Sequence, residues 1–115
     1  MELEASVHIL SALAHASRLT VFRLLVQAGE GGLPAGEIAR RTGIVPSTLS
    51  THLAVLAQAG LIVARRDGRL IIYTADYARM RELLGFLLED CCAGAPEVCA
   101  PLAEIAARAA CCPAG

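Results

Sequence analysis

The stretch of sequence that decides the fold reads RRTGIVPSTLSTHLAVLAQAGLIVARRDGRLIIY, from Arg40 to Tyr73. Gly43 follows a short helical run, where a residue that ends a helix is expected. Pro46 suits the first turn of a new helix, because its missing N–H would have no helical partner there. Two helices joined by a tight glycine turn are typical of a helix-turn-helix, whose second helix enters the major groove of DNA.

The new helix, predicted from about Pro46 to Ala59, has two different faces. Its apolar stripe consists, at helical spacing, of Leu49, Leu53, Leu56 and Gly60. The opposite face is formed by Ser47, Thr51, Ala54 and Gln58, with Thr48 and His52 on its flanks. That face is polar and almost uncharged, whereas a solvated face usually carries Glu, Lys and Arg. Small hydroxyl side chains near a helix N-terminus can approach base edges and phosphates closely. Capping and filler residues on a surface helix are the alternative interpretation.

The sequence after this helix predicts a β-hairpin. Two β-rich runs, 61–64 and 70–74, are joined by Arg65-Arg66-Asp67-Gly68-Arg69. The Asp-Gly pair is a strong hairpin signal. Three arginines at the hairpin tip favour a wing that lies along the DNA backbone or in the minor groove. The alternative is a solvated turn.

The charge of the chain is distributed unevenly, although its net value over 115 residues is only −1. Residues 38–75 hold five arginines against Asp67 alone, whereas residues 1–37 and 76–115 are both net acidic. The positive charge is therefore concentrated on the predicted helix-turn-helix and hairpin. Such a concentration is the electrostatic footprint of a surface that binds phosphates.

The remaining segments complete a mainly α fold with a β-hairpin wing. Further helices are predicted at 3–14, at 35–42 and at 76–90, and a last short helix is predicted at 100–110. Another helix is predicted to begin after Ser17, which would cap it, and a loop is predicted at 29–34. The apolar residues of the first helix are Leu3, Val7, Leu10 and Ala14, and those expected to face inward from the second are Leu19, Phe22, Leu25 and Val26. We interpret His8 and His15 as packing or surface histidines. We expect a winged helix-turn-helix domain of order α-α-α-α-β-β-α at residues 1–93, followed by a cysteine-bearing tail at 94–115.

A chain of this length forms one small domain with a thin core, and a dimer would bury more apolar surface. The uncharged run 42–64 contains Pro46 and several polar residues, so it does not have the composition of a membrane span. The N-terminus has no signal-peptide pattern. We therefore expect a cytosolic protein without a membrane partner.

At this point the chain resembles the ArsR/SmtB family of metal-responsive winged-helix repressors, over roughly residues 8–92. The resemblance is carried by Leu13-Ala14-His15-Ala16-Ser17-Arg18-Leu19, Pro46-Ser47-Thr48-Leu49-Ser50-Thr51-His52-Leu53, Ala59-Gly60-Leu61-Ile62, and Arg66-Asp67-Gly68-Arg69 followed by Tyr73. It implies a homodimer held by the first and last helices and bound to a palindromic operator. The DNA-contact positions that it implies are Ser47, Thr48, Ser50, Thr51 and His52 on the helix, and Arg65, Arg66 and Arg69 on the wing.

All five cysteines lie after residue 90, and a disulfide framework is not expected in a reducing cytosol. Cys91, Cys92 and Cys99 flank a Gly-Ala-Pro break and can converge on one atom. A disulfide between the two adjacent cysteines would be strained, because their Cα atoms are about 3.8 Å apart. Trivalent arsenic or antimony accepts three thiolates, whereas zinc requires four ligands with spaced pairs. We therefore expect As(III) or Sb(III) as the inducer ligand and no organic cofactor.

The cysteine pattern resembles the arsenite-sensing branch of the family, which carries its cysteines after the last helix. The helices at 35–59 contain no cysteine and the helix at 76–90 contains no histidine, so the other metal sites of the family are missing. Redox or persulfide sensing, zinc binding and an accidental cluster remain as alternatives. The pair Cys111-Cys112 is either part of a frayed tail or an accessory dithiol site. A small thiol oxidoreductase would need a Cys-x-x-Cys at a helix start or a phosphate-binding loop, so an enzyme is not expected.

Overall fold

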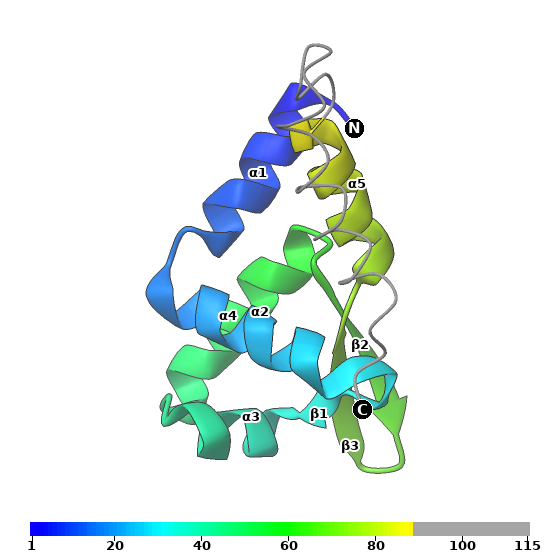
Figure 1. The fold of residues 1–115 in the computed structure, drawn as a ribbon. Helices are drawn as coiled ribbons and strands as arrows, with labels where there is room; N and C mark the ends of the chain where they lie inside the picture. Colours follow the sequence, from blue (N-terminus) through cyan, green and yellow to red (C-terminus); the bar gives the residue numbers. More distant parts are fainter. Residues whose placement is uncertain (89–115) are drawn as a thin grey trace.

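The computed structural model describes residues 1–88 of the chain. The elements follow in the order α1 (Leu3–Leu13), α2 (Ala16–Ala28), the 3-10 turn η1 (Gly29–Gly31), β1 (Leu33–Pro34), α3 (Ala35–Thr42), α4 (Pro46–Gln58), β2 (Ile62–Asp67), β3 (Leu70–Ala75) and α5 (Tyr77–Leu88) (Figure 1). This order confirms the predicted α-α-α-α-β-β-α arrangement and adds one short strand, β1. The predicted end of α5 at Asp90, the predicted helix at 100–110 and all five cysteines lie outside the described residues.

The sheet has three antiparallel strands in the order β1-β3-β2. Asp67 pairs with Leu70, so Gly68 and Arg69 form the whole turn of the hairpin. Gly68 has a φ of 63°, which hairpin turns of this length require at their first central position. The predicted hairpin is therefore confirmed, but its first strand runs on to Asp67 and the linking segment is shorter than expected.

Strand β1 lies where the sequence predicted only a loop. Leu33 pairs with Tyr73 and Pro34 with Ile72 at the free edge of β3. Gly32, at a φ of 65°, precedes the strand, and a Cβ atom there would collide with the carbonyl oxygen of Tyr73. A strand of two residues is too short to show an alternating pattern, so the sequence could not predict it.

The hydrophobic core lies where α1, α2, α3, α4, α5 and the sheet meet. Its most completely buried apolar side chains are Ile9, Val21, Leu25, Ile38, Leu49, Leu56, Leu61 and Ile62. The predicted stripe of α4 is confirmed, because Leu49, Leu53 and Leu56 are all buried. For α2, Phe22 and Leu25 face inward as expected, but Leu19 and Val26 are exposed. Only one narrow face of α2 can therefore contact the core.

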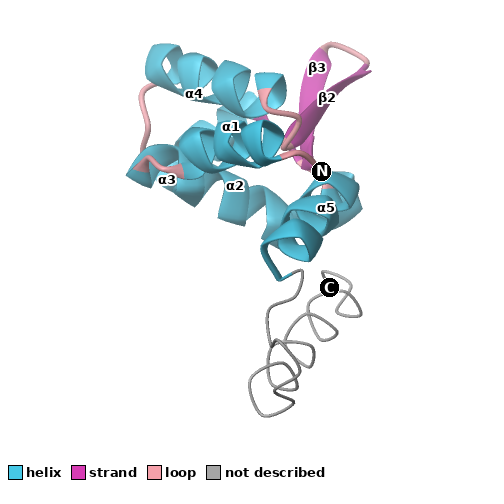
Figure 2. Ribbon diagram, turned by 90° about the horizontal axis from the view of Figure 1, so that it is seen from above, coloured by secondary structure: helices cyan, strands magenta, loops and turns pink. Residues whose placement is uncertain are grey.

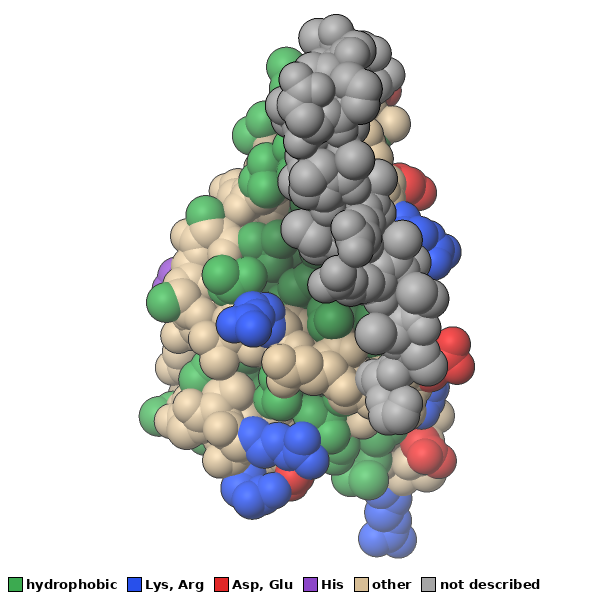
Figure 3. Space-filling view, in the orientation of Figure 1, with side chains coloured by type: hydrophobic (Ala, Val, Ile, Leu, Met, Phe, Trp, Pro, Cys, Tyr) green, Lys and Arg blue, Asp and Glu red, His purple; other side chains and the backbone are tan. Residues whose placement is uncertain are grey.

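The apolar residues that the sequence analysis identified on α1 do not form the buried face of that helix. Leu3, Val7 and Leu10 are exposed, the first at 68%, and the residues that face the core are Ser6, Ile9 and Ala12. On α5, Leu84 and Leu87 are exposed while Leu83 is buried. The two helices contact each other at one end of the molecule (Figure 1), and hydrophobic side chains follow α1 on the surface (Figure 3). We call Leu3, Val7, Leu10, Leu84 and Leu87 the α1–α5 apolar residues.

Helices α1 and α2 meet at a sharp corner. The N-cap of α2 is His15, whose Nδ1 accepts a hydrogen bond from the N–H of Ser17 (3.1 Å), so the predicted Ser17 cap is wrong by two residues. The Nε–H of Arg18 donates to the carbonyl of Ala12 (2.6 Å) across the corner. In the described part of the chain no single helix is long and apolar enough to cross a membrane. Helices α1 and α2, taken together with η1, are long and apolar enough, but the two helices are bent by 98° relative to each other.

Candidate nucleic-acid interface

Helices α3 and α4 form the predicted helix-turn-helix. Gly43 ends α3 in the left-handed conformation with a φ of 74°, and its N–H donates to the carbonyl of Ala39 (2.8 Å). Pro46 opens α4, and Val45 caps it without any side-chain hydrogen bond. The first N–H groups of α4 are thus left without a protein cap. Exposed N–H groups at a helix N-terminus attract phosphates through hydrogen bonding and the helix dipole.

The outer face of α4 carries only short or uncharged side chains. Ser47, Thr48, Ser50 and Thr51 are all exposed, as the sequence predicted. The hydroxyl of Thr51 donates to the carbonyl of Ser47 at 3.4 Å, a weak bond that leaves the oxygen lone pairs open. Seen from above, α4 and the β2–β3 hairpin lie along the same side of the molecule (Figure 2). A duplex placed on that side can therefore contact both elements.

His52 is placed differently from the other predicted contact residues, which are exposed, and its expected contact with DNA stays a prediction. Its side chain is only 7% exposed, because it lies on the buried side of α4 beside Leu49 and Leu53. The imidazole rings of His52 and His15 have their centroids 4.6 Å apart and are tilted by 52°. Burial, together with the nearby His15 and Arg18, lowers the pKa of His52.

The three arginines of the wing differ in their surroundings. The guanidinium of Arg65 donates to the carbonyls of Glu30 (3.2 Å) and Gly31 (3.1 Å), and so ties β2 to η1. Arg66 and Arg69 lie at the end of the hairpin and are exposed, where basic side chains are seen at the lower edge of the molecule (Figure 3). Arg65 was predicted as a tip residue, but the longer β2 places it in the strand. Phosphate binding by Arg65, Arg66 and Arg69 stays a prediction, and the bonds of Arg65 to η1 make it the least available of the three for a DNA contact.

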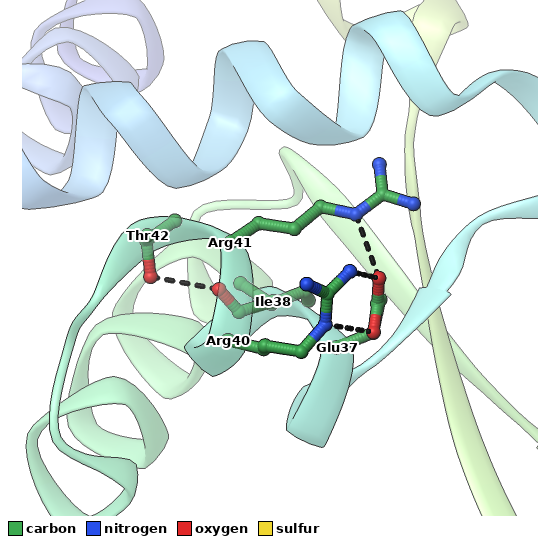
Figure 4. Close-up of polar contacts among 5 residues, drawn as sticks. All are labelled: Glu37, Ile38, Arg40, Arg41 and Thr42. Atoms are coloured by element: carbon green, nitrogen blue, oxygen red, sulfur yellow. Dashed lines mark hydrogen bonds and ion pairs between the residues drawn. The ribbon is translucent and has the colours of Figure 1, made fainter.

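The positive charge of α3 is partly neutralised by Glu37, which sequence reasoning did not associate with this surface. The Nε–H groups of Arg40 and Arg41 both donate to the Glu37 carboxylate at 2.9 Å, and Arg40 adds a second bond through Nη2 (Figure 4). Hydrogen bonds first from Arg40 and then from Arg41 lower the pKa of Glu37 to about 2. The spacings of three and four residues could have revealed this contact. Residues 35–75 thus hold five arginines against Glu37 and Asp67.

The structure does not describe any of the residues that are predicted to bind a metal ion. Cys91, Cys92, Cys99, Cys111 and Cys112 all lie outside the described residues. Within residues 1–88, no group of three or more His, Cys, Asp or Glu side chains is arranged to hold a metal ion.

Comparison with known proteins identifies the fold and the family. A family model described as a helix-turn-helix domain matches residues 13–65, from the end of α1 into β2. The HTH-type transcriptional regulator YgaV of Escherichia coli is 33% identical over 89 residues, which cover 77% of this chain and 88% of that protein. The biofilm growth-associated repressor of Xylella fastidiosa is 34% identical over 86 residues, covering 75% of this chain and 73% of that protein.

Among solved structures, the homodimeric winged helix-turn-helix DNA-binding domain of a possible ArsR-family transcriptional regulator from Mycobacterium bovis is similar to this chain. Its TM-score is 0.61 at 32% identity, and the match covers 76% of this chain and 82% of that domain. The same order of helices with a hairpin wing is therefore found in proteins that regulate transcription and are not enzymes. The chain belongs to the ArsR/SmtB family of winged helix-turn-helix transcriptional regulators.

Proposed function

We propose that this chain is an arsenic(III)-responsive repressor that binds a palindromic operator as a homodimer and releases it when Cys91, Cys92 and Cys99 bind As(III) or Sb(III). The observation that carries its DNA-binding part is the exposed, uncharged outer face of α4 beside the basic end of the hairpin. Short hydroxyl side chains allow the α4 backbone to approach base edges, and arginines beside it bind phosphates. The reading residues are then Ser47, Thr48, Ser50 and Thr51.

The proposed dimer rests on the α1–α5 apolar residues. They leave a small chain with large hydrophobic side chains open to water on two adjacent helices, and a second copy would cover them. The related domain from Mycobacterium bovis is described as homodimeric. A two-fold axis through these helices would place two α4 helices on one duplex, and a palindromic operator mirrors such an axis.

The proposed sensor rests on the chemistry of the thiols. Three cysteines follow directly on α5, one of the two proposed dimer helices, and the elements from α1 to α5 contain none. Three thiolates complete the coordination of a trivalent arsenic or antimony ion. The three negative charges and the 3+ charge of the ion sum to zero. Free thiols are mostly neutral at pH 7, so the bound ion does not repel DNA by a new charge. Release would instead follow from a change in the dimer helix and in the spacing of the two reading helices.

One titration tests the proposal. The complex with a fluorescently labelled operator is titrated with arsenite, antimonite, Zn(II) and peroxide, and release is followed by anisotropy. We expect arsenite and antimonite to release the operator. A shift from mostly bound to mostly free requires that the ligand favour the released form by about 5 kcal/mol. Release by peroxide alone would support the alternative of a thiol redox or persulfide sensor, and release by Zn(II) alone would contradict both.

A further inference from the structure

His15 and His52 form a contact that DNA reading by the outer face of α4 does not use. His15 caps α2 and His52 lies on the inner side of α4, so the contact between their tilted rings joins the N-terminus of one helix to the reading helix. The Nδ1 atom of His52 is buried and has no hydrogen-bond partner among the described residues. A buried imidazole whose ring nitrogen has no partner is an unusual choice for a position that a leucine would fill.

The same contact is connected to α1, one of the two proposed dimer helices. The N–H of His15 donates to the carbonyl of Leu13 (2.8 Å), and the carbonyl of His15 accepts from the N–H of Leu19 (2.9 Å). Arg18 reaches back to the carbonyl of Ala12. The imidazole of His15 is thus held by the corner between α1 and α2, and it contacts His52 on α4.

The contact leaves His52 without a partner that would stabilise a positive charge. The Nδ1 of His15 accepts the N–H of Ser17, so that ring is held in place by the cap of α2. His52 is buried between His15 and Arg18, so a positive charge on it would lack solvation and face other positive groups. α4 also packs against α1, α3 and β2. Their titratable side chains are Glu4 and His8 on α1, Glu37, Arg40 and Arg41 on α3, and Arg65, Arg66 and Asp67 on β2, and α2 carries Arg23 in addition to Arg18.

None of these acidic groups offsets a charge on His52. The causes that act on its pKa are burial, His15 and Arg18, and all three lower it. The carboxylate of Glu37, on α3, is already bound to Arg40 and Arg41. Protonation of His52 would therefore push it away from the α1–α2 corner.

We propose that His52 is a positioning residue for the reading helix, and that its uncharged contact with His15 makes specific operator binding fall as the medium is acidified. The proposal rests on the proposed function only in taking α4 as the reading helix. The inner side of α4 is docked through this contact, and the outer side reads bases. A displaced α4 loses base contacts while the wing keeps its phosphate contacts.

The sign of the effect follows from proton linkage. The pKa of His52 is lowered while α4 is docked against the α1–α2 corner, so His52 takes up a proton when that docked arrangement opens. The arrangement is therefore fully stable above the ordinary histidine pKa of about 6.5 and loses stability as the pH falls below it. One linked proton changes the dissociation constant by at most about tenfold per pH unit. General electrostatics predicts the opposite trend, since added positive charge strengthens DNA binding.

The test measures operator and random-sequence binding by anisotropy from pH 8 to pH 5.5 at constant salt. For the wild type, the operator dissociation constant should rise on acidification, while random-sequence binding stays level or tightens. His52→Leu fills the buried position without a titrating group. It should bind operator more weakly at neutral pH but with a flat pH profile.

Two further variants keep the test decisive. His15→Asn retains an N-cap but removes the imidazole that contacts His52, so it should also flatten the profile. It replaces His52→Leu in the test if circular dichroism shows that His52→Leu does not fold. His8→Asn, at an exposed position on α1, should keep the wild-type profile. An operator profile that is level in the wild type, or that keeps its slope in His52→Leu and His15→Asn, overturns the proposal. If the pH dependence of operator binding is absent but the protein still prefers operator to random DNA, the proposal that α4 reads DNA remains valid.

Discussion

At the scale of single residues, the three wing arginines should respond differently to mutation. Arg66 and Arg69 are exposed at the end of the hairpin, whereas Arg65 is bound to two carbonyls of η1. Arg66→Ala and Arg69→Ala should weaken binding to operator and random DNA alike. Each should lower the slope of log affinity against log salt by about 1, since a lost phosphate contact releases one counterion fewer. Anisotropy titrations over a salt series measure both quantities.

Arg65→Ala is the matched control for this prediction. This substitution removes the same charge as the other two. The side chain of Arg65 also holds β2 to η1 through its hydrogen bonds, so its loss should lower the midpoint of thermal unfolding more than the other two substitutions do. Its salt slope should change least of the three. Equal salt slopes in all three variants and the wild type would remove the wing from the interface.

A second residue-scale prediction concerns Glu37. Its carboxylate occupies Arg40 and Arg41 and adds a negative charge beside the proposed DNA surface. Glu37→Gln should therefore tighten binding to all DNA sequences and steepen the salt dependence, most clearly at low salt. Because the pKa of Glu37 is lowered to about 2, the contribution of its ion pairs is complete above the ordinary Glu pKa and is lost only as the pH falls toward 2. Glu30→Gln, on η1, is the control for a lost acidic charge away from α3. Weaker DNA binding by Glu37→Gln would mean that the carboxylate positions the arginines.

At the scale of elements, α4 offers a test of base reading. Ser47→Ala and Thr51→Ala remove hydroxyls from the N-terminal half of its exposed face. If these groups contact bases, operator binding should weaken by roughly 1–3 kcal/mol for a contact of good geometry, while random-sequence binding stays unchanged. Gln58→Ala, at the other end of the same face, is the matched control and should alter neither. If both affinities fall together in the Ser47 and Thr51 variants, these residues only position the backbone.

The accuracy of sequence-based prediction also differs from element to element. The α3–turn–α4 unit and the hairpin were predictable, because Gly43, Pro46 and Asp67-Gly68 are local signals that fix backbone conformation. The buried face of α1 was not, because Leu3, Val7 and Leu10 face outward, whereas Ile9 faces the core together with the small residues Ser6 and Ala12. Burial depends on what a helix packs against, which hydrophobicity alone does not encode.

The candidate site shows the same division between local and tertiary information. The exposed hydroxyl face of α4 follows from helical spacing, and that part of the prediction is confirmed as a placement. The burial of His52 requires α2 beside it, and the bonds of Arg65 to η1 join residues 34 and 35 positions apart. No local pattern contains such contacts. The roles of the exposed residues in DNA binding remain predictions.

At the scale of the whole molecule, the α1–α5 apolar residues predict the oligomeric state. Val7→Glu on α1 or Leu87→Glu on α5 places a charge among residues that a second copy would bury, so each variant should be monomeric. Operator affinity should then fall by about 100-fold or more, because a monomer contacts one half-site and loses the linked contact with the second. Sedimentation equilibrium and anisotropy measure the two effects. Val63→Glu, at a residue of similar exposure on β2, should remain dimeric, and a wild type that is already monomeric would refute the proposed interface.

The whole-molecule response to arsenic should depend on the first three cysteines and not on the last two. Cys91→Ser, Cys92→Ser and Cys99→Ser should each fold and bind operator, since none belongs to α4 or the wing. Each should lose most of its release by arsenite, because a site reduced to two thiolates forfeits one bond and its closed geometry. Operator release is measured by anisotropy, with arsenic bound per monomer counted alongside.

Two comparisons make this prediction specific. A methylated arsenical has only two open positions, so Cys99→Ser, which retains the adjacent pair, should be the variant least impaired toward it. The double variant Cys111→Ser with Cys112→Ser should keep the full arsenite response and the wild-type count of bound arsenic if the tail pair is not part of the sensor. Since three thiolates and a trivalent ion are neutral together, arsenite should also leave the salt slope of random-sequence binding unchanged. If the Cys91→Ser protein still releases operator at the wild-type arsenite concentration, the three-cysteine site is wrong and Cys111 with Cys112 becomes the leading candidate.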